Sequence, residues 1–128
     1  MTTQTFGPYS PIRQAGNTYY ISGQVGVDPE TKQAPADIAS QTKQVMRNMQ
    51  TVLAEAGLQL SDVVKVGIML RDMADFTIVN ETYQTYFEPP RPARSTVAVR
   101  ELPRVGGENP ILVEIEAIAH KSDAGGAQ

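Results

Sequence analysis

Apolar side chains recur at helical spacing between positions 36 and 56, and this pattern fixes one element of the fold. They are Ile38, Val45, Met46, Met49, Val52, Leu53 and Ala56. Side chains at such steps share one face of an α-helix, so the segment predicts a long amphipathic helix that covers an apolar surface. Gly57 predicts the end of this helix, because glycine readily adopts the left-handed conformation that commonly follows a helix.

The segments on both sides of this helix have the patterns of strands and of a second helix. Turn-forming Gly16 and Asn17 divide the first β-rich segment into a hairpin. Asp72 is expected to begin the second helix as its N-cap. In chain order the expected elements are a hairpin at 12–22, the first helix, a strand at 63–70, the second helix ending before 88–92, and strands at 94–99 and 111–119. The order ββαβαββ predicts an α+β fold with both helices on one face of a sheet.

Two helices cover only one face of such a sheet, so the other face needs a partner. Because side chains alternate along a strand, each of the last two strands presents two different faces. We expect the helices to cover the faces that carry Val97, Val99, Val113 and Ile115. The opposite faces then carry Arg94, Thr96, Glu114 and Glu116. This mixed surface predicts an interface between subunits, with Arg94 and Glu114 on the same side.

The composition excludes several kinds of site. The 128 residues include no cysteine and a single histidine, so disulfides, zinc sites and a cysteine nucleophile are excluded and no cofactor is expected. The net charge of −3 argues against nucleic acid as a partner. Neither a signal peptide nor a membrane-spanning run is recognisable, so we expect a cytoplasmic protein. Residues 122–128 are expected to be a disordered tail after a single domain at 1–121.

Five short segments occur in an order that resembles one protein family. They are residues 7–10 (GPYS), 21–24 (ISGQ), 79–80 (VN), 92–96 (PARST) and 113–119 (VEIEAIA). Together they resemble the successive motifs of the RidA/YjgF family of reactive-intermediate imine deaminases, an older name for which is endoribonuclease L-PSP. The resemblance implies a chorismate-mutase-like fold with one mixed sheet. It also implies a homotrimer with its helices outside and a cleft at each subunit interface.

The resemblance further implies an activity, the hydrolysis of 2-imino or enamino acids to 2-oxo acids and ammonia. Arg94 matches the family arginine that binds the substrate carboxylate. A guanidinium suits this role because it is planar, always protonated and forked, so it matches a carboxylate with two hydrogen bonds. Glu114 matches the glutamate that handles the attacking water, and Glu116 on the same strand face is the rival candidate.

Other positions match residues that line the family cleft. Tyr9 and Ser22 are expected to hydrogen-bond the substrate, and Gly23 allows its close approach to the backbone. Asn80 matches a site position on the second helix. Thr96 stands where many of these deaminases have cysteine, and residues 104–110 form a longer loop than in compact members. Both departures leave the identity of the imine or 2-oxo acid open.

Two other functions remain as alternatives. One is endoribonuclease or translation inhibition, although the acidic charge and the lack of a histidine pair argue against it. The other is a non-catalytic carboxylate-binding or chaperone-like trimer. An aminoacrylate-handling activity is a variation on the leading hypothesis.

Overall fold

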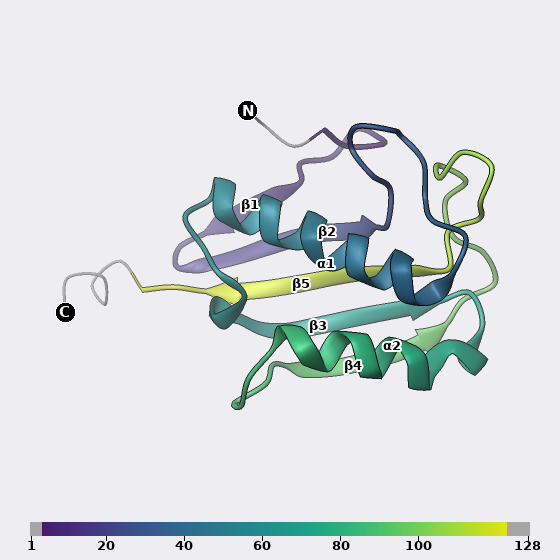
Figure 1. The fold of residues 1–128 in the computed structure, drawn as a ribbon. Helices are drawn as coiled ribbons and strands as arrows, with labels where there is room; N and C mark the ends of the chain where they lie inside the picture. Colours follow the sequence, from purple (N-terminus) through teal and green to yellow (C-terminus); the bar gives the residue numbers. More distant parts are fainter. Residues whose placement is uncertain (1–3, 123–128) are drawn as a thin grey trace.

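A computed structural model describes residues 4–122 and confirms the predicted order of elements. Five strands form a single mixed sheet in the order β1-β2-β5-β3-β4. Both helices lie on one side of this sheet (Figure 1). The strands are β1 (Ile12–Ala15), β2 (Thr18–Val25), β3 (Val63–Leu70), β4 (Ala93–Ala98) and β5 (Val113–His120). The helices are α1 (Ile38–Glu55) and α2 (Phe76–Tyr83).

The start and the end of helix α1 each have a local cause in the sequence. Asp37 caps its N-terminus, and one carboxylate oxygen accepts a 2.8 Å hydrogen bond from the Ser40 backbone N–H. Gly57 adopts φ +76° just after the helix, as its position in the sequence predicts. The apolar face between these ends packs on the sheet, and Val45, Val52 and Leu53 are fully buried there.

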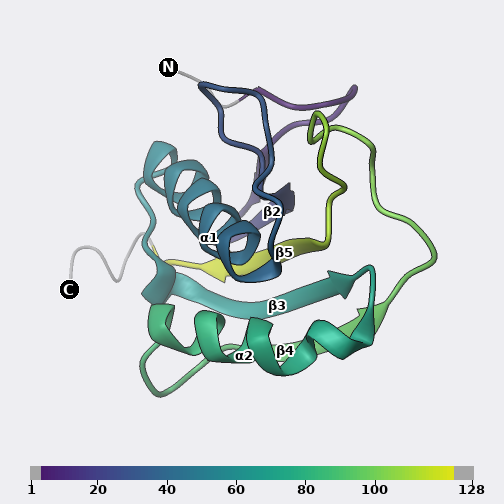
Figure 2. The ribbon, with the colours of Figure 1, turned by 45° about the vertical axis from the view of Figure 1, so that its right-hand side comes forward.

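Helix α2 follows a single turn of 3₁₀ helix, Met73–Asp75. Asp72 caps that turn by accepting a 2.9 Å hydrogen bond from the Ala74 N–H. The residue predicted to cap the second helix therefore caps the 3₁₀ turn before it, and α2 itself begins at Phe76. A second 3₁₀ turn, Gln84–Tyr86, closes the segment. Turning the molecule shows α1 and α2 side by side on one face of the sheet, with α2 beside β4 (Figure 2).

The hairpin turns at Gly16, which has φ +61°, as predicted, but β2 continues three residues beyond the expected end. An irregularity in pairing makes this possible, because the register of β2 with β5 shifts between Ile21 and Gln24. The shift is a β-bulge, which leaves one extra residue on the bulged strand and re-aims the side chains around it. Ser22 and Gly23 occupy this bulge.

The centre of the sheet is β5, which pairs antiparallel with both β2 and β3, while β3 pairs in parallel with β4 at the sheet edge. Residues directly opposite one another on neighbouring strands share a face. The helix-covered face of β3 and β5 is fully apolar and carries Val66, Ile68, Leu70, Val113, Ile115 and Ala117. The prediction that the helices cover the face with Val113 and Ile115 is therefore confirmed.

The predicted orientation of β4 is wrong. Arg94 and Thr96 lie opposite the buried Val66 and Ile68, so they face the helices. Val97 lies on the other face and is 50% exposed, and Val99 follows the end of the strand. The physical reason is that both faces of β4 are partly apolar, so polarity alone does not tell which face the helices cover.

The loop between β2 and α1 (residues 26–37) and the loop between β4 and β5 (residues 99–112) pack together and form a small second core. Val25, Val27, Ala34 and Ile111 are buried in it. Gln41 of α1, itself fully buried, ties both loops to the helix. Its side-chain NH₂ donates to the Pro35 and Pro110 carbonyls at 2.8 and 2.7 Å, and its oxygen accepts from the Leu112 N–H at 2.8 Å. These bonds hold the chain immediately before β5.

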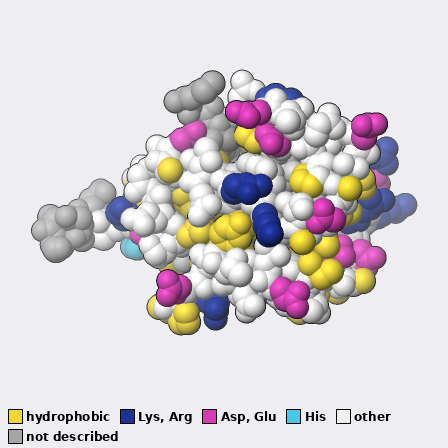
Figure 3. All heavy atoms as spheres, in the orientation of Figure 1, with side chains coloured by type: hydrophobic (Ala, Val, Ile, Leu, Met, Phe, Trp, Pro, Cys, Tyr) yellow, Lys and Arg dark blue, Asp and Glu magenta, His cyan; other side chains and the backbone are white. Residues whose placement is uncertain are grey.

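On the helix-covered side, charged side chains of both signs are scattered among small apolar patches (Figure 3). Within residues 4–122, no helix has the length and apolar character needed to cross a membrane. Of the predicted tail at 122–128, all but Ser122 lies outside the described residues.

Candidate functional site

Arg94 lies between β4 and α2, at the edge of the sheet. Its Nη2 donates a 2.7 Å hydrogen bond to the side-chain oxygen of Asn80 on α2. The guanidinium carbon also lies 5.7 Å from the centre of the Phe76 ring and 5.0 Å from that of Tyr83. Both distances are within the range of a cation–π interaction. Arg94 is thus held by three side chains of one helix.

Thr96 lies on the same face of β4 as Arg94 and is also covered by the helical layer. Its hydroxyl oxygen is buried and has no hydrogen-bond partner among the described residues. The hydroxyl oxygen of Tyr83 is likewise buried and has no hydrogen-bond partner among these residues. Burial raises the pKa of Tyr83, although the charges of Arg94 and Arg91 act in the opposite direction. The hydroxyl is therefore uncharged at neutral pH.

Glu114 lies on the opposite, uncovered face of the sheet, on β5. It is directly opposite Met69 of β3, and its carboxylate lies against the backbone of Gly23 in the β2 bulge. A side chain at position 23 would occupy the space of that carboxylate, so glycine is required there. Burial, and secondarily the negative charge of Glu116, raises the pKa of Glu114 above its ordinary value.

Glu116 shares the open face with Glu114 but is exposed and lies over Gly67 of β3. The two carboxylates therefore rest on different glycines of neighbouring strands. Of the two, Glu114 is the one that lies beside the bulge and is partly buried.

Ser22 connects the bulge to the segment before β1. Its hydroxyl donates a 2.6 Å hydrogen bond to the Ser10 carbonyl, and its backbone N–H donates to the Pro11 carbonyl at 3.0 Å. Tyr9 belongs to this same segment, and its side chain is 48% exposed. Ser22, Gly23 and Glu114 thus lie together at the bulge, and Tyr9 directly precedes the residue whose carbonyl Ser22 binds.

The predicted site residues consequently fall into two groups that one chain does not bring together. Arg94, Asn80 and Thr96 lie on the helix side of the sheet edge. Ser22, Gly23 and Glu114 lie at the β2 bulge, with Glu114 on the open face, and Tyr9 lies in the segment before β1. The expectation that Arg94 and Glu114 share a face within one chain is wrong, because the pairing places them on opposite faces.

The contacts of Phe76 and Tyr83 with Arg94 are not predicted from the sequence. A signal was present in the sequence. Phe76, Asn80 and Tyr83 stand at positions i, i+4 and i+7, which is the spacing of one face of a helix. One polar residue between two aromatic residues on that face indicates a place for a cation.

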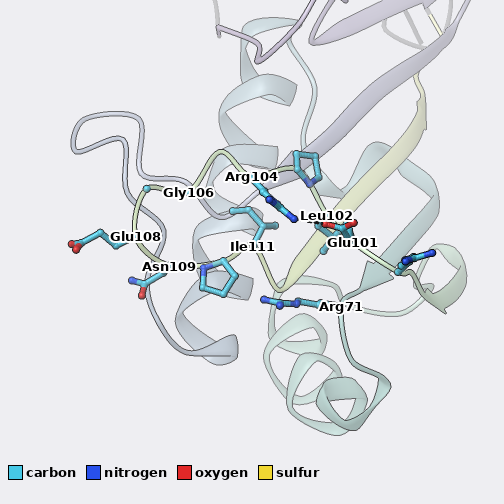
Figure 4. Close-up of a pocket in the computed structure, with 12 residues that line it drawn as sticks. Arg71, Glu101, Leu102, Arg104, Gly106, Glu108, Asn109 and Ile111 are labelled. Atoms are coloured by element: carbon cyan, nitrogen blue, oxygen red, sulfur yellow. Dashed lines mark hydrogen bonds and ion pairs between the residues drawn. The ribbon is translucent and has the colours of Figure 1, made fainter.

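A hollow of about 340 Å³ lies elsewhere, beside the loop that follows β4. Arg71 from the end of β3 and Arg104 from the loop border it, with Ile111 between them in the view of Figure 4. Arg104 is paired with Glu101 at 2.8 Å, and both side chains are exposed. None of the predicted site residues lines this hollow. Across residues 4–122, no cluster of three or more acidic or histidine side chains has the arrangement of a metal site.

Comparison with known proteins identifies relatives along almost the whole chain. The family model of Endoribonuclease L-PSP matches residues 2–121. A mouse 2-iminobutanoate/2-iminopropanoate deaminase is 46% identical over 114 residues, which are 88% of this chain and 81% of the mouse protein. The crystal structure of RidA from an Antarctic Psychrobacter is 38% identical, with a TM-score of 0.86 over 94% of both chains. Escherichia coli TdcF with bound serine is 34% identical, with a TM-score of 0.84 over 94% of both chains.

Proposed function

The chain belongs to the RidA/YjgF family, also called Endoribonuclease L-PSP, and from this premise we propose that it is an imine deaminase. Its substrates are small 2-imino or enamino acids such as 2-iminopropanoate and 2-iminobutanoate. The products are the corresponding 2-oxo acids and ammonia. The name of the 46% identical mouse relative supports this substrate class. The bound serine of the TdcF structure supports a site for a small molecule with a carboxylate.

The observation that carries the proposal is the separation of Arg94 from Glu114 by the sheet. A carboxylate binder and a water-activating carboxylate act on one small substrate only when they lie a few ångströms apart. Since one chain places them on opposite faces, the site is completed by two copies of the chain. One copy contributes Arg94, Asn80 and Thr96, and its neighbour contributes Tyr9, Ser22, Gly23 and Glu114.

In a homotrimer, three such interfaces form a closed ring. Each copy offers the Arg94 group to one neighbour and the Glu114 group to the other, so the interface is heterologous and a ring closes it. The uncovered sheet face, which carries exposed Val97 and Tyr20, is then covered by the partners. The proposed trimer has three sites, one at each subunit interface.

The reaction requires one anion binder and one proton carrier. Arg94 binds the substrate carboxylate with two hydrogen bonds and fixes the position of C2. Glu114 accepts a proton from a water molecule as the water oxygen bonds to C2, and it passes this proton to the imine nitrogen, which gives a carbinolamine. Glu114 then carries the proton of the new hydroxyl to the same nitrogen, the C–N bond breaks as the C=O bond forms, and ammonia leaves with the 2-oxo acid.

The raised pKa of Glu114 supports this role. A general base works best when its pKa is close to the operating pH, and burial moves a carboxylate in that direction. Gly23 keeps space free for the carboxylate, and Ser22 and Tyr9 line the approach. Thr96 lies beside Arg94, where its backbone and hydroxyl border the carboxylate end of the substrate.

Turnover of freshly generated imine tests the proposal. Arg94→Ala and Arg94→Lys are expected to lose most of the acceleration of 2-oxobutanoate release, because lysine does not reproduce the planar fork. Arg104→Ala is the matched control, since Arg104 is an exposed arginine outside the two groups. Wild-type rates in Arg94→Ala would contradict the proposal. Binding of 2-oxobutanoate without any imine turnover by the wild type would instead indicate a non-catalytic carboxylate-binding protein.

A further inference from the structure

Tyr83 is buried beside Arg94 but has no role in the mechanism above. Its side chain is 5% exposed, and its ring lies 5.0 Å from the guanidinium carbon of Arg94. We propose that Tyr83 is a positioning residue for Arg94, which acts through its aromatic ring and not through its hydroxyl. This inference rests on the proposed function, because it concerns the residue that binds the substrate carboxylate.

The spacing along α2 brings two rings into contact with the guanidinium. Phe76 and Tyr83 are seven residues apart, which corresponds to roughly 10.5 Å along a helix axis. The guanidinium carbon lies 5.7 Å from the centre of the Phe76 ring and 5.0 Å from that of the Tyr83 ring, so it contacts both. Its hydrogen bond goes to Asn80, which lies between them along the helix.

The Tyr83 ring is itself held in place. Phe87 packs against it with ring centres 4.9 Å apart, and Phe87 is also buried. On the side of α2, Asn80 accepts the hydrogen bond from Nη2 of Arg94. Arg94 thus contacts two rings and is anchored at one nitrogen, and within residues 4–122 no other hydrogen bond occupies its remaining N–H groups.

The hydroxyl of Tyr83 does not account for its position. The oxygen is buried and has no hydrogen-bond partner among residues 4–122. A buried unpaired hydroxyl costs stability, so no contact of the oxygen with these residues explains why the side chain lies here. The negative face of the ring, in contrast, stabilises the adjacent cation in a desolvated place.

Holding the guanidinium before the substrate arrives reduces the entropy that binding must remove. An unrestrained arginine has several rotatable bonds, and ordering such a side chain opposes association. Tyr83 thus supports substrate affinity more than the proton transfers at Glu114. Its loss is expected to raise KM and leave kcat nearly unchanged.

Two sets of variants separate the ring from the hydroxyl. Tyr83→Phe retains the ring, whereas Tyr83→Leu and Tyr83→Met replace it with aliphatic or thioether side chains. Tyr83→Phe is expected to bind 2-oxobutanoate as the wild type does and to be at least as stable. Tyr83→Leu and Tyr83→Met are expected to bind it roughly tenfold more weakly, with a similar rise in KM. Tyr19→Leu is the control, since Tyr19 is a partly buried tyrosine on β2, which β5 and β3 separate from the strand of Arg94.

A ligand-free measurement completes the test. The NMR signals of the Arg94 side chain are expected to show ring-current shifts in the wild type and in Tyr83→Phe. Tyr83→Leu and Tyr83→Met are expected to lose the contribution of Tyr83 to these shifts. Unchanged Arg94 signals and unchanged 2-oxobutanoate affinity in both aliphatic variants would overturn the inference. Equal weakening in Tyr83→Phe would also overturn it, because the hydroxyl would then be responsible.

These outcomes also distinguish the inference from the proposed function. A wild-type protein that neither binds 2-oxobutanoate nor hydrolyses imine overturns the proposed function. The NMR comparison still decides whether Tyr83 positions Arg94 in that case, because it requires no substrate.

Discussion

Arg94 and Glu114 lie on opposite faces of the same sheet. Arg94 is opposite Val66, whose side chain is buried beneath the helices, and Glu114 is opposite Met69 on the uncovered face. The sheet therefore separates the two side chains on which the proposed chemistry depends.

Mixing two inactive variants is expected to restore activity. Arg94→Ala and Glu114→Gln should each be inactive alone, because every interface then lacks one essential side chain. When the two are unfolded together and reassembled in equal amounts, about one quarter of the interfaces combine an intact Arg94 with an intact Glu114. Imine hydrolysis should recover to about that fraction of the wild-type rate.

The control for this experiment is a mixture of Arg94→Ala with the double variant that carries both substitutions. No interface in that mixture holds an intact Arg94, so it should stay inactive. Absence of recovery in the first mixture, when mass measurements show mixed oligomers, would mean that a site does not span two copies.

Glu116→Gln is expected to extend activity to lower pH. Burial and the charge of Glu116 both raise the pKa of Glu114, and Glu114 must be ionised to accept a proton from water. Removing the charge of Glu116 lowers the pKa of Glu114 toward its ordinary value, so the acid limb of kcat/KM should move to lower pH. An acid limb that stays in place or moves to higher pH would show that Glu114 is not the group that titrates.

Gly23→Ala is expected to impair catalysis more than Gly67→Ala. A methyl group at position 23 would displace the carboxylate of Glu114, whereas one at position 67 would meet the end of the Glu116 side chain. Steady-state rates should fall strongly in Gly23→Ala, with the far-UV spectrum and the oligomer mass preserved. If Gly67→Ala proves the more damaging of the pair, Glu116 and not Glu114 is the catalytic carboxylate.

Gln41→Ala is expected to destabilise the protein by about 2–5 kcal/mol, because it creates a cavity and leaves the Leu112 N–H and two carbonyls without their partner. Denaturant unfolding at a fixed protein concentration would measure the loss. Gln44→Ala is the matched control on the same helix, since the side chain of Gln44 bonds to the side chains of Asn48 and Arg47, which belong to that helix. Similar losses in the two variants would show that Gln41 does not anchor the loops.

Local patterns sufficed to predict the element order, the end of α1 at Gly57 and the turn at Gly16. These features depend on spacing and backbone preference within a few residues, which the sequence contains directly. The resemblance to one family added the site residues and the order in which they occur. The family and the α+β sheet are confirmed, whereas the roles of the site residues stay predictions.

The faces of β4 could not be predicted for a physical reason. An apolar residue such as Val97 signals that its face is covered, but the cover is either a helix of the same chain or a second subunit. Arg94 has the opposite ambiguity, because aromatic neighbours and an amide make a charged side chain acceptable beneath a helix. Only the pairing of β4 with β3 decides between the two orientations.

The hydrogen bonds of Gln41 allow the loop before β5 to differ in length between related proteins. The loop between Arg100 and Asn109 is fixed at its end by bonds to Pro110 and Leu112, two residues before Glu114. Residues inserted before Pro110 therefore change the rim of the molecule while β5 keeps its register. Such a loop is a place where residues can be added or removed without displacing the strand that carries the carboxylate of Glu114.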